Sequence, residues 1–137
     1  MIPLLLDTCA ALWLAEEAHI AKAAIDALVQ AGAEDQPTYL SPISGWEIGL
    51  LVANGRLRLP VSPEAWFERA LARPQIRLTD LTVRILIASS SLPGSPPRDP
   101  ADRILAATAR ENGYCLMTRD RHLLKYAEQG YVQALAC

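Results

Sequence analysis

Short apolar segments alternate with longer amphipathic ones along this sequence, and that alternation restricts the fold more than any other feature. Five segments of strand length are expected, at residues 2–6, 38–42, 76–78, 114–118 and 131–136. The first of them, "IPLLL", is apolar throughout, which is typical of a strand covered on both faces. Strands that alternate with helices predict an α/β protein, a three-layer α/β/α sandwich around a mostly parallel sheet of about five short strands.

Helical patterns fill the intervals between these strands, and three of them begin with a capping residue followed by proline. The caps are Ser41-Pro42, Ser62-Pro63 and Asp99-Pro100. The expected helices lie at 8–17, 19–33, 43–55, 64–72, 82–91, 98–113 and 121–129. We find no linker, repeat or low-complexity tract, so residues 1–137 are predicted to form a single domain.

Composition narrows the class of protein. The net charge of -2 does not by itself indicate a nucleic-acid-binding protein. Three cysteines without metal or disulfide spacing predict reduced thiols in a cytoplasmic protein. The apolar start "MIPLLLDTCAALWLA" has no basic residue and is interrupted by Asp7, so we expect neither a signal peptide nor a membrane span.

Four acidic residues, far apart in sequence, are expected at one edge of the sheet. Asp7 directly follows the first strand and Asp120 directly follows the fourth. Asp102 opens the helix that leads into the fourth strand, and Glu47 lies in the second turn of the helix after the second strand. Ligands of open parallel sheets bind beyond the carboxyl ends of the strands, which is where these acids should meet.

Each acid also has a simpler interpretation. Asp99 and Asp102 suit the start of a helix, Glu47 could be a surface residue, and Asp120 could pair with a neighbouring arginine. Several carboxylates in one place repel each other, and either protonation or a divalent cation relieves that repulsion. With only oxygen ligands on offer, Mg²⁺ or Mn²⁺ is the expected ion, and water polarised by such an ion can hydrolyse a phosphodiester.

Other chemistries find no support in the sequence. There is no P-loop, no G-x-G-x-x-G, no G-x-S-x-G and no histidine placed for a triad. Arginines accompany the acids: Arg103 adjoins Asp102, and Arg119 and Arg121 flank Asp120. Arginine can hold a phosphate with two hydrogen bonds, although these residues are equally compatible with a solvated helix face.

Four segments together carry a family resemblance: "LLLDT", "SPISGWEIGLLVANGRLRLP", "RDPADRILAATA" and "LMTRDRHL". In this order they resemble the PIN-domain ribonucleases, and more narrowly the VapC-type toxins of bacterial toxin–antitoxin pairs. The resemblance implies a PIN-like α/β/α fold and Mg²⁺- or Mn²⁺-dependent cleavage of RNA. It also implies a homodimer and a cognate antitoxin that blocks the site.

Matched motif by motif, the resemblance makes Asp7, Glu47, Asp102 and Asp120 the acids of the catalytic site, with Asp7 and Asp102 as the metal ligands. The hydroxyls of Thr8 and Thr118 lie beside these acids and are expected to orient water or phosphate. Arg103, Arg119 and Arg121 are the expected contacts to the RNA backbone.

Some alternatives remain open at this stage. The aromatic residues Trp13, Trp46, Trp66 and Phe67 could line a groove for a partner helix, but core positions are the more common use of such residues. The chain could be a non-catalytic PIN-like binding module, or an RNA-processing nuclease that is not a toxin. A phosphatase using Asp7 as nucleophile is disfavoured, because "LLLDTCAA" lacks the second nearby aspartate.

Overall fold

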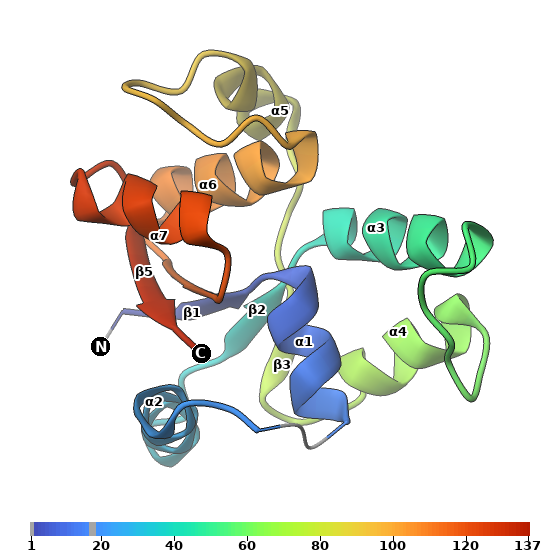
Figure 1. Cartoon of the computed structure of the whole chain (residues 1–137). Coiled ribbons are helices and arrows are strands. Elements are labelled where there is room, and N and C mark those ends of the chain that lie inside the picture. Colours follow the sequence, from blue (N-terminus) through green and yellow to red (C-terminus); the bar gives the residue numbers. More distant parts are fainter. Residues whose placement is uncertain (1, 17–18) are drawn as a thin grey trace.

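The computed structural model describes residues 2–16 and 19–137, and its centre is one five-stranded sheet in the order β3-β2-β1-β4-β5 (Figure 1). The strands are β1 (Leu4–Leu6), β2 (Thr38–Leu40), β3 (Ile76–Leu78), β4 (Cys115–Thr118) and β5 (Gln133–Ala136). All four pairings between neighbouring strands are parallel. The predicted α/β/α fold is therefore confirmed, with a sheet that is parallel throughout.

Seven helices in the described part of the chain connect the strands. They are α1 (Thr8–Ala15), α2 (Lys22–Ala33), α3 (Pro42–Ala53), α4 (Pro63–Leu71), α5 (Val83–Ser90), α6 (Pro100–Asn112) and α7 (Arg121–Glu128). None of the helices in residues 2–16 and 19–137 combines the length and apolarity needed to cross a membrane. The predicted end of the first helix, at residue 17, lies outside the described residues.

The helix starts follow the capping chemistry expected from the sequence. The side chains of Ser41, Ser62 and Asp99 accept hydrogen bonds from backbone N–H groups in the first turns of α3, α4 and α6. Helix α2 starts three residues later than predicted, with Ala21 as a cap whose side chain makes no hydrogen bond and whose N–H donates to the Cys137 carbonyl at 3.3 Å. Proline and cap together thus fix where α3, α4 and α6 begin.

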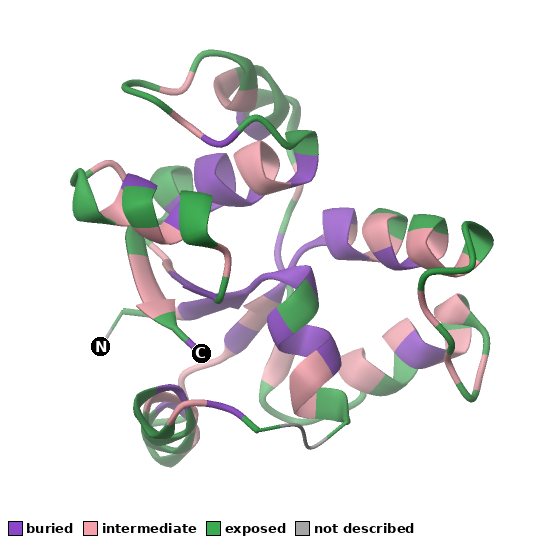
Figure 2. Ribbon diagram, viewed as in Figure 1, coloured by how far each residue is buried: buried purple, intermediate pink, exposed green. Residues whose placement is uncertain are grey.

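Apolar residues of the strands contribute to two hydrophobic cores, one on each face of the sheet (Figure 2). Leu4 and Leu6 face the core formed with α1, α2 and α4, whereas Leu5 faces the core formed with α6 and α7. This opposition follows from the twofold alternation of side chains along a strand. Helix α3 serves both cores, through Ile48 on one side and Ile43 on the other.

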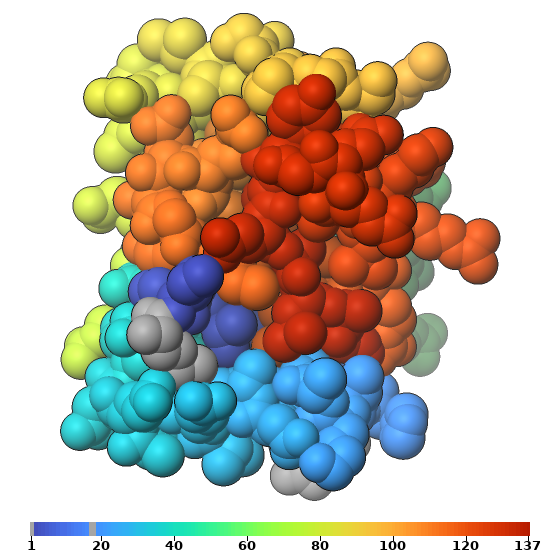
Figure 3. Space-filling view, turned by 90° about the vertical axis from the view of Figure 1, so that its left-hand side faces the viewer, coloured from blue at the N-terminus to red at the C-terminus, as the bar shows by residue number. Residues whose placement is uncertain are grey.

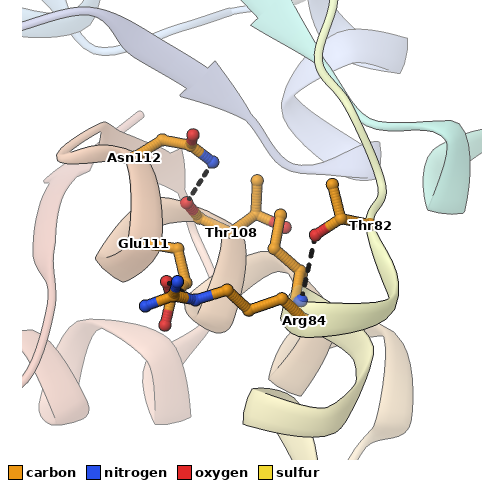
Figure 4. A network of polar contacts seen from close by, with 6 residues as sticks. Thr82, Arg84, Thr108, Glu111 and Asn112 are labelled. Atoms are coloured by element: carbon orange, nitrogen blue, oxygen red, sulfur yellow. Dashed lines mark hydrogen bonds and ion pairs between the residues drawn. The ribbon is translucent and has the colours of Figure 1, made fainter.

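Peripheral elements are fixed by local contacts. Viewed from the side of α7 and β5, α2 lies against the C-terminal segment and covers the lower part of the molecule (Figure 3). Helix α5 packs along α6, where Arg84 Nε lies 3.1 Å from Glu111 Oε2 and the Thr82 hydroxyl caps α5 (Figure 4). Within α6, the Asn112 side chain donates to the Thr108 carbonyl at 3.0 Å, in the last turn of the helix.

The strand order brings the carboxyl ends of β1 and β4 side by side. Successive strands β1, β2 and β3 extend the sheet to one side, and the chain then returns to add β4 on the opposite side of β1. A reversal of this kind marks the edge at which open parallel sheets commonly bind their ligands. Asp7 follows β1 at this point, and Asp120 follows β4.

Candidate active site: an acidic cluster at the carboxyl edge

Asp7 is the most deeply buried of the four predicted acids, with 6% of its surface exposed. It caps α1, because its Oδ1 accepts a hydrogen bond from the Ala10 N–H at 2.7 Å. Its Oδ2 accepts from the Thr118 hydroxyl, the last residue of β4, at 2.5 Å. Burial nevertheless outweighs these hydrogen bonds and raises the pKa of Asp7 above its ordinary value, with a further contribution from Asp120.

Asp120 is joined to Asp7 through the same threonine. The backbone N–H of Asp120 donates to Thr118 Oγ1 at 3.0 Å, while the Thr118 hydroxyl donates to Asp7. Asp120 also caps α7, since its Oδ1 accepts from the Leu123 N–H at 2.9 Å. One fully buried hydroxyl therefore sets the relative positions of two acids that come from different strands.

Glu47 reaches the same place from α3. Its carboxylate accepts a hydrogen bond from the Thr8 hydroxyl of α1, and Thr8 Oγ1 also lies 2.9 Å from Ser44 Oγ. Thr8 and Ser44 are both buried. Burial raises the pKa of Glu47, and the negative charges of Asp99 and Asp7 raise it further.

Asp102 completes the cluster from the first turn of α6, where its carboxylate accepts no side-chain or cap hydrogen bond from any described residue. The helix stripe that it heads faces the core as predicted, with Leu105 and Ala106 fully buried. Burial, followed by repulsion from Asp99, Asp120, Glu47 and Asp7, raises the pKa of Asp102 to about 7. Near neutral pH this carboxyl is thus divided between its protonated and ionised forms.

The thiol of Cys9 shows that all four acids surround one small region. Although this residue is solvent-exposed, its thiol is partly desolvated, and this together with the charges of Asp7, Glu47, Asp102 and Asp120 raises its pKa to about 11. The predicted convergence of the four acids at the sheet edge therefore agrees with the geometry. The positive charge of Arg119 lowers the pKa of Asp7 but does not outweigh the effect of burial.

The donor set suits a hydrated divalent cation rather than a fully protein-ligated one. Within residues 2–16 and 19–137, no three His, Cys, Asp or Glu side chains are placed to hold a metal ion directly. Mg²⁺ commonly takes one or two carboxylates and retains several waters. Desolvated and mutually repelling carboxylates of this kind are what such a cation stabilises.

Two of the three predicted RNA-contacting arginines are engaged elsewhere in the fold. The Arg119 guanidinium donates to the carbonyls of Cys137 and His19, each at 2.9 Å, and lies 3.8 Å from the ring centroid of Trp13. Arg103 donates from Nε to the Ser89 carbonyl in the last turn of α5 at 2.8 Å, and from a terminal guanidinium nitrogen to the Pro97 carbonyl of the loop before α6 at 3.2 Å. Arg121, in contrast, is exposed in the first turn of α7.

The aromatic residues divide between the core and the surface. Trp66 is buried, and Trp13 and Phe67 pack against the same core, as the core interpretation predicts. For Trp46 that interpretation is wrong, because 54% of its surface is exposed. Its position in α3, one residue before Glu47, does not turn it toward either core.

Sequence reasoning missed two residues beside the acids, Cys9 and Ser44. A signal for Ser44 was present, since it lies three residues before Glu47 and therefore on the same face of α3. Cys9 carried no such signal, because nothing in its sequence context separates a thiol among carboxylates from an ordinary free cysteine.

Comparison with known proteins identifies the family of this chain. The PIN domain family model matches residues 4–129. Ribonuclease VapC22 of Mycobacterium tuberculosis is 32% identical over 124 residues, which cover 90% of this chain and 91% of that protein.

Solved structures show the same fold. The Rickettsia felis VapBC2 complex bound to a promoter DNA fragment contains a chain that matches with a TM-score of 0.68, at 12% identity and 98% coverage of both chains. A chain of FitAcB from Neisseria gonorrhoeae matches with a TM-score of 0.52, at 21% identity and 96% coverage of both. With a family model matched along almost its whole length and a curated relative above 30% identity, this chain belongs to the PIN-domain family, among its VapC-type members.

Proposed function

We propose that this protein is a metal-dependent endoribonuclease and the toxin of a toxin–antitoxin pair. The observation that carries the proposal is the convergence of Asp7, Glu47, Asp102 and Asp120 on one region, where burial and mutual repulsion raise the pKa values of three of them. Such a cluster costs stability unless a cation binds, and carboxylates perturbed by burial and by one another are typical of functional sites. The ribonuclease name of the VapC22 relative supports RNA as the substrate.

In this proposal Asp7 and Asp102 bind Mg²⁺ or Mn²⁺, which supplies charge stabilisation and lowers the pKa of water. Asp7 is held by its two hydrogen bonds, so its carboxylate is already oriented before a ligand arrives. Glu47 and Asp120 complete the acidic site and position the attacking water. Glu47 is fixed for this by the hydroxyl of Thr8.

Thr8 and Thr118 orient acids rather than phosphate in our proposal, since both hydroxyls are buried in hydrogen bonds to the carboxylates. Arg121 is the arginine that we assign to the RNA backbone. Arg119 and Arg103 stabilise the fold instead, because Arg119 bonds the Cys137 carbonyl after β5 and Arg103 bonds the Ser89 carbonyl of α5.

The test is cleavage of total cellular RNA by the purified protein in Mg²⁺, in Mn²⁺ and in chelator. Discrete products should form only with metal, and both Asp7→Asn and Asp102→Asn should abolish them. Asp26→Asn is the matched control, because Asp26 is an exposed acid of α2 that pairs with Lys22 outside the cluster. Cleavage that survives both site variants would overturn the proposal.

A cognate antitoxin and a homodimer belong to the same proposal. The solved relatives in the comparison are VapBC and FitAB complexes, which supports a protein partner for this chain. Expression of the parent should arrest growth, Asp102→Asn should not, and co-expression of a small protein encoded next to the gene should relieve the arrest. Equal growth with parent and variant would favour the alternative of an RNA-processing nuclease that is not a toxin.

A further inference from the structure

Ser44 is a fully buried hydroxyl that lies behind one of the four acids. It belongs to the first turn of α3, and its Oγ lies 2.9 Å from Thr8 Oγ1 of α1. Thr8 is also buried and bonds the carboxylate of Glu47. Helices α1 and α3 start at the carboxyl edge of the sheet, after β1 and β2, and they contact each other (Figure 1). Two buried hydroxyls from adjacent helices thus form a chain of hydrogen bonds that ends on Glu47.

The hydrogen bond of Ser44 differs from those of other hydroxyls within the helices. Serine and threonine side chains inside a helix commonly bond a carbonyl of that same helix. Three side chains of α5 and α6 do so, each to a carbonyl three or four residues earlier: Ser89, Ser90 and Thr108. The partner of Ser44 lies 36 positions away in sequence, on another helix. Its hydroxyl is therefore directed to the acidic site and not to its own backbone.

The number of protons fixes the direction of this chain. A hydroxyl has one proton to donate, whereas an ionised carboxylate only accepts. The bond between Thr8 and Glu47 uses the single proton of Thr8, so the proton between the two hydroxyls comes from Ser44. In the reverse order the Ser44 proton would have no acceptor among the described residues, and a buried donor without a partner is costly.

This direction gives the two carboxylate oxygens of Glu47 different roles. Oε1 accepts from the Thr8 hydroxyl, and Oε2 accepts no hydrogen bond from residues 2–16 or 19–137. Glu47 is only half-buried, so packing alone does not fix the rotation of its carboxylate. The bond at Oε1 sets that rotation and leaves Oε2 as the oxygen that can accept from water.

We propose that Ser44 is a positioning residue for RNA cleavage, which acts through Thr8 and holds Glu47 with Oε2 directed to the attacking water. This inference rests on the proposed function, in which Glu47 positions that water. Hydrogen bonds in a chain polarise one another, so the proton donated by Ser44 strengthens the bond from Thr8 to the carboxylate. The chain does not include the proposed metal ligands, and it therefore affects the chemical step and not the binding of substrate.

The experiment measures kcat and KM on an oligoribonucleotide with a mapped cleavage site, in Mg²⁺. Ser44→Ala should lower kcat about 3- to 10-fold at unchanged KM, the range that one hydrogen bond between uncharged groups supplies. Thr8→Val removes the donor to the carboxylate itself and should lower kcat about 10- to 150-fold. Adding Ser44→Ala to Thr8→Val should cause no further loss, because the chain is already broken. Thr8→Ser keeps the hydroxyl and should retain both the activity and the sensitivity to Ser44→Ala.

Ser41→Ala is the matched control. Ser41 is another fully buried serine three residues earlier, and its hydroxyl caps α3 by accepting from the Ile43 N–H at 3.1 Å. Loss of this cap should lower the free energy of unfolding while kcat per folded molecule stays that of the parent. An equal kcat for Ser44→Ala and parent would overturn the inference. Losses that multiply in the double variant, or an equal fall of kcat in Ser41→Ala, would overturn it as well.

A second measurement needs neither metal nor RNA. The bond from Thr8 lowers the pKa of Glu47, against the larger opposite effect of burial. NMR titration of the Glu47 carboxyl carbon in chelator should therefore show a higher pKa in Ser44→Ala, a still higher one in Thr8→Val, and no change in Ser41→Ala. An unchanged pKa in Ser44→Ala would contradict the chain of hydrogen bonds itself.

Failure of the proposed function has a different signature. A parent that cleaves no RNA in Mg²⁺ or Mn²⁺ overturns the proposed function, and with it the role of Ser44 in cleavage, even where the pKa of Glu47 responds. A parent that cleaves RNA while Ser44→Ala matches it in kcat removes only the inference about Ser44.

Discussion

Replacing Asp102 by Asn should stabilise the metal-free protein at pH 8 and have little effect at pH 4. The pKa of Asp102 rises from 3.8 to about 7 on folding, so between these pH values the native state binds more protons than the unfolded state. Stability attributable to this group therefore falls as pH rises through that window and stays low above it. The asparagine does not titrate and escapes the loss.

The magnitude follows from the shift. About three pKa units at 1.36 kcal/mol each set an upper bound of about 4 kcal/mol. Asp102 is only half-buried, and solvent screening reduces the figure to about 2 kcal/mol. For a chain of this length that corresponds to a rise in Tm of roughly 7 °C at pH 8.

The measurement is thermal unfolding in chelator between pH 4 and pH 8.5, followed by titration with Mg²⁺. Glu64→Gln is the matched control, since Glu64 is likewise an acid in the first turn of a helix, α4, but is exposed. That substitution should lower stability slightly, by about 0.3–1 kcal/mol, through loss of a favourable helix-dipole interaction. Mg²⁺ should raise the Tm of the parent and not that of Asp102→Asn. A variant less stable than the parent at pH 8, or a difference independent of pH, would refute the reasoning.

Three further predictions concern residues around the cluster. Asp7→Asn should abolish RNA cleavage while changing the free energy of unfolding in urea by no more than about 1 kcal/mol. The amide oxygen retains the cap of α1, and removal of a buried charge offsets the loss of the bond that Asp7 accepts from the Thr118 hydroxyl. Thr118→Val should destabilise by about 1–3 kcal/mol in the same assay, since it removes a buried hydroxyl that both donates and accepts, and a loss below about 0.5 kcal/mol would contradict the linking role. Arg119→Lys should lower the free energy of unfolding by about 1–3 kcal/mol, because lysine cannot bond two carbonyls while lying over Trp13. Its RNA cleavage per folded molecule should match that of the parent. A fall in activity at full stability would indicate that Arg119 contacts the substrate.

The fold was predictable because its determinants are local. Capping residues followed by proline mark the starts of α3, α4 and α6 to within a residue or two, and apolar runs bounded by turns mark the strands. The start of α2 was missed because no capping side chain marks it in the sequence: Ala21 stands at the N-cap and makes no side-chain hydrogen bond.

The positions of the acids were predictable as well, for a different reason. Parallel strand topology carries Asp7 and Asp120 to one edge, so their meeting follows from the order of elements. The exposure of Trp46 and the internal bonds of Arg119 could not be foreseen, because a helix's orientation about its own axis and the partners of a long side chain are settled only by packing. Sequence thus located the acids but not the side chains that surround them.

The hydrogen bond between Asp7 and Thr118 joins residues 111 positions apart, and this has a consequence for the protein during its own synthesis. At a synthesis rate of roughly 5–20 residues per second, about 6 to 22 s pass between the emergence of Asp7 and the emergence of Thr118. Throughout that interval the growing polypeptide carries Asp7 and Glu47 without β4, one of the two strands that pair with β1. The acidic cluster joins residues far apart in sequence, and it is complete only after Thr118 and Asp120 leave the ribosome. A cell translating this message therefore meets the completed acidic cluster only after chain elongation has passed these residues.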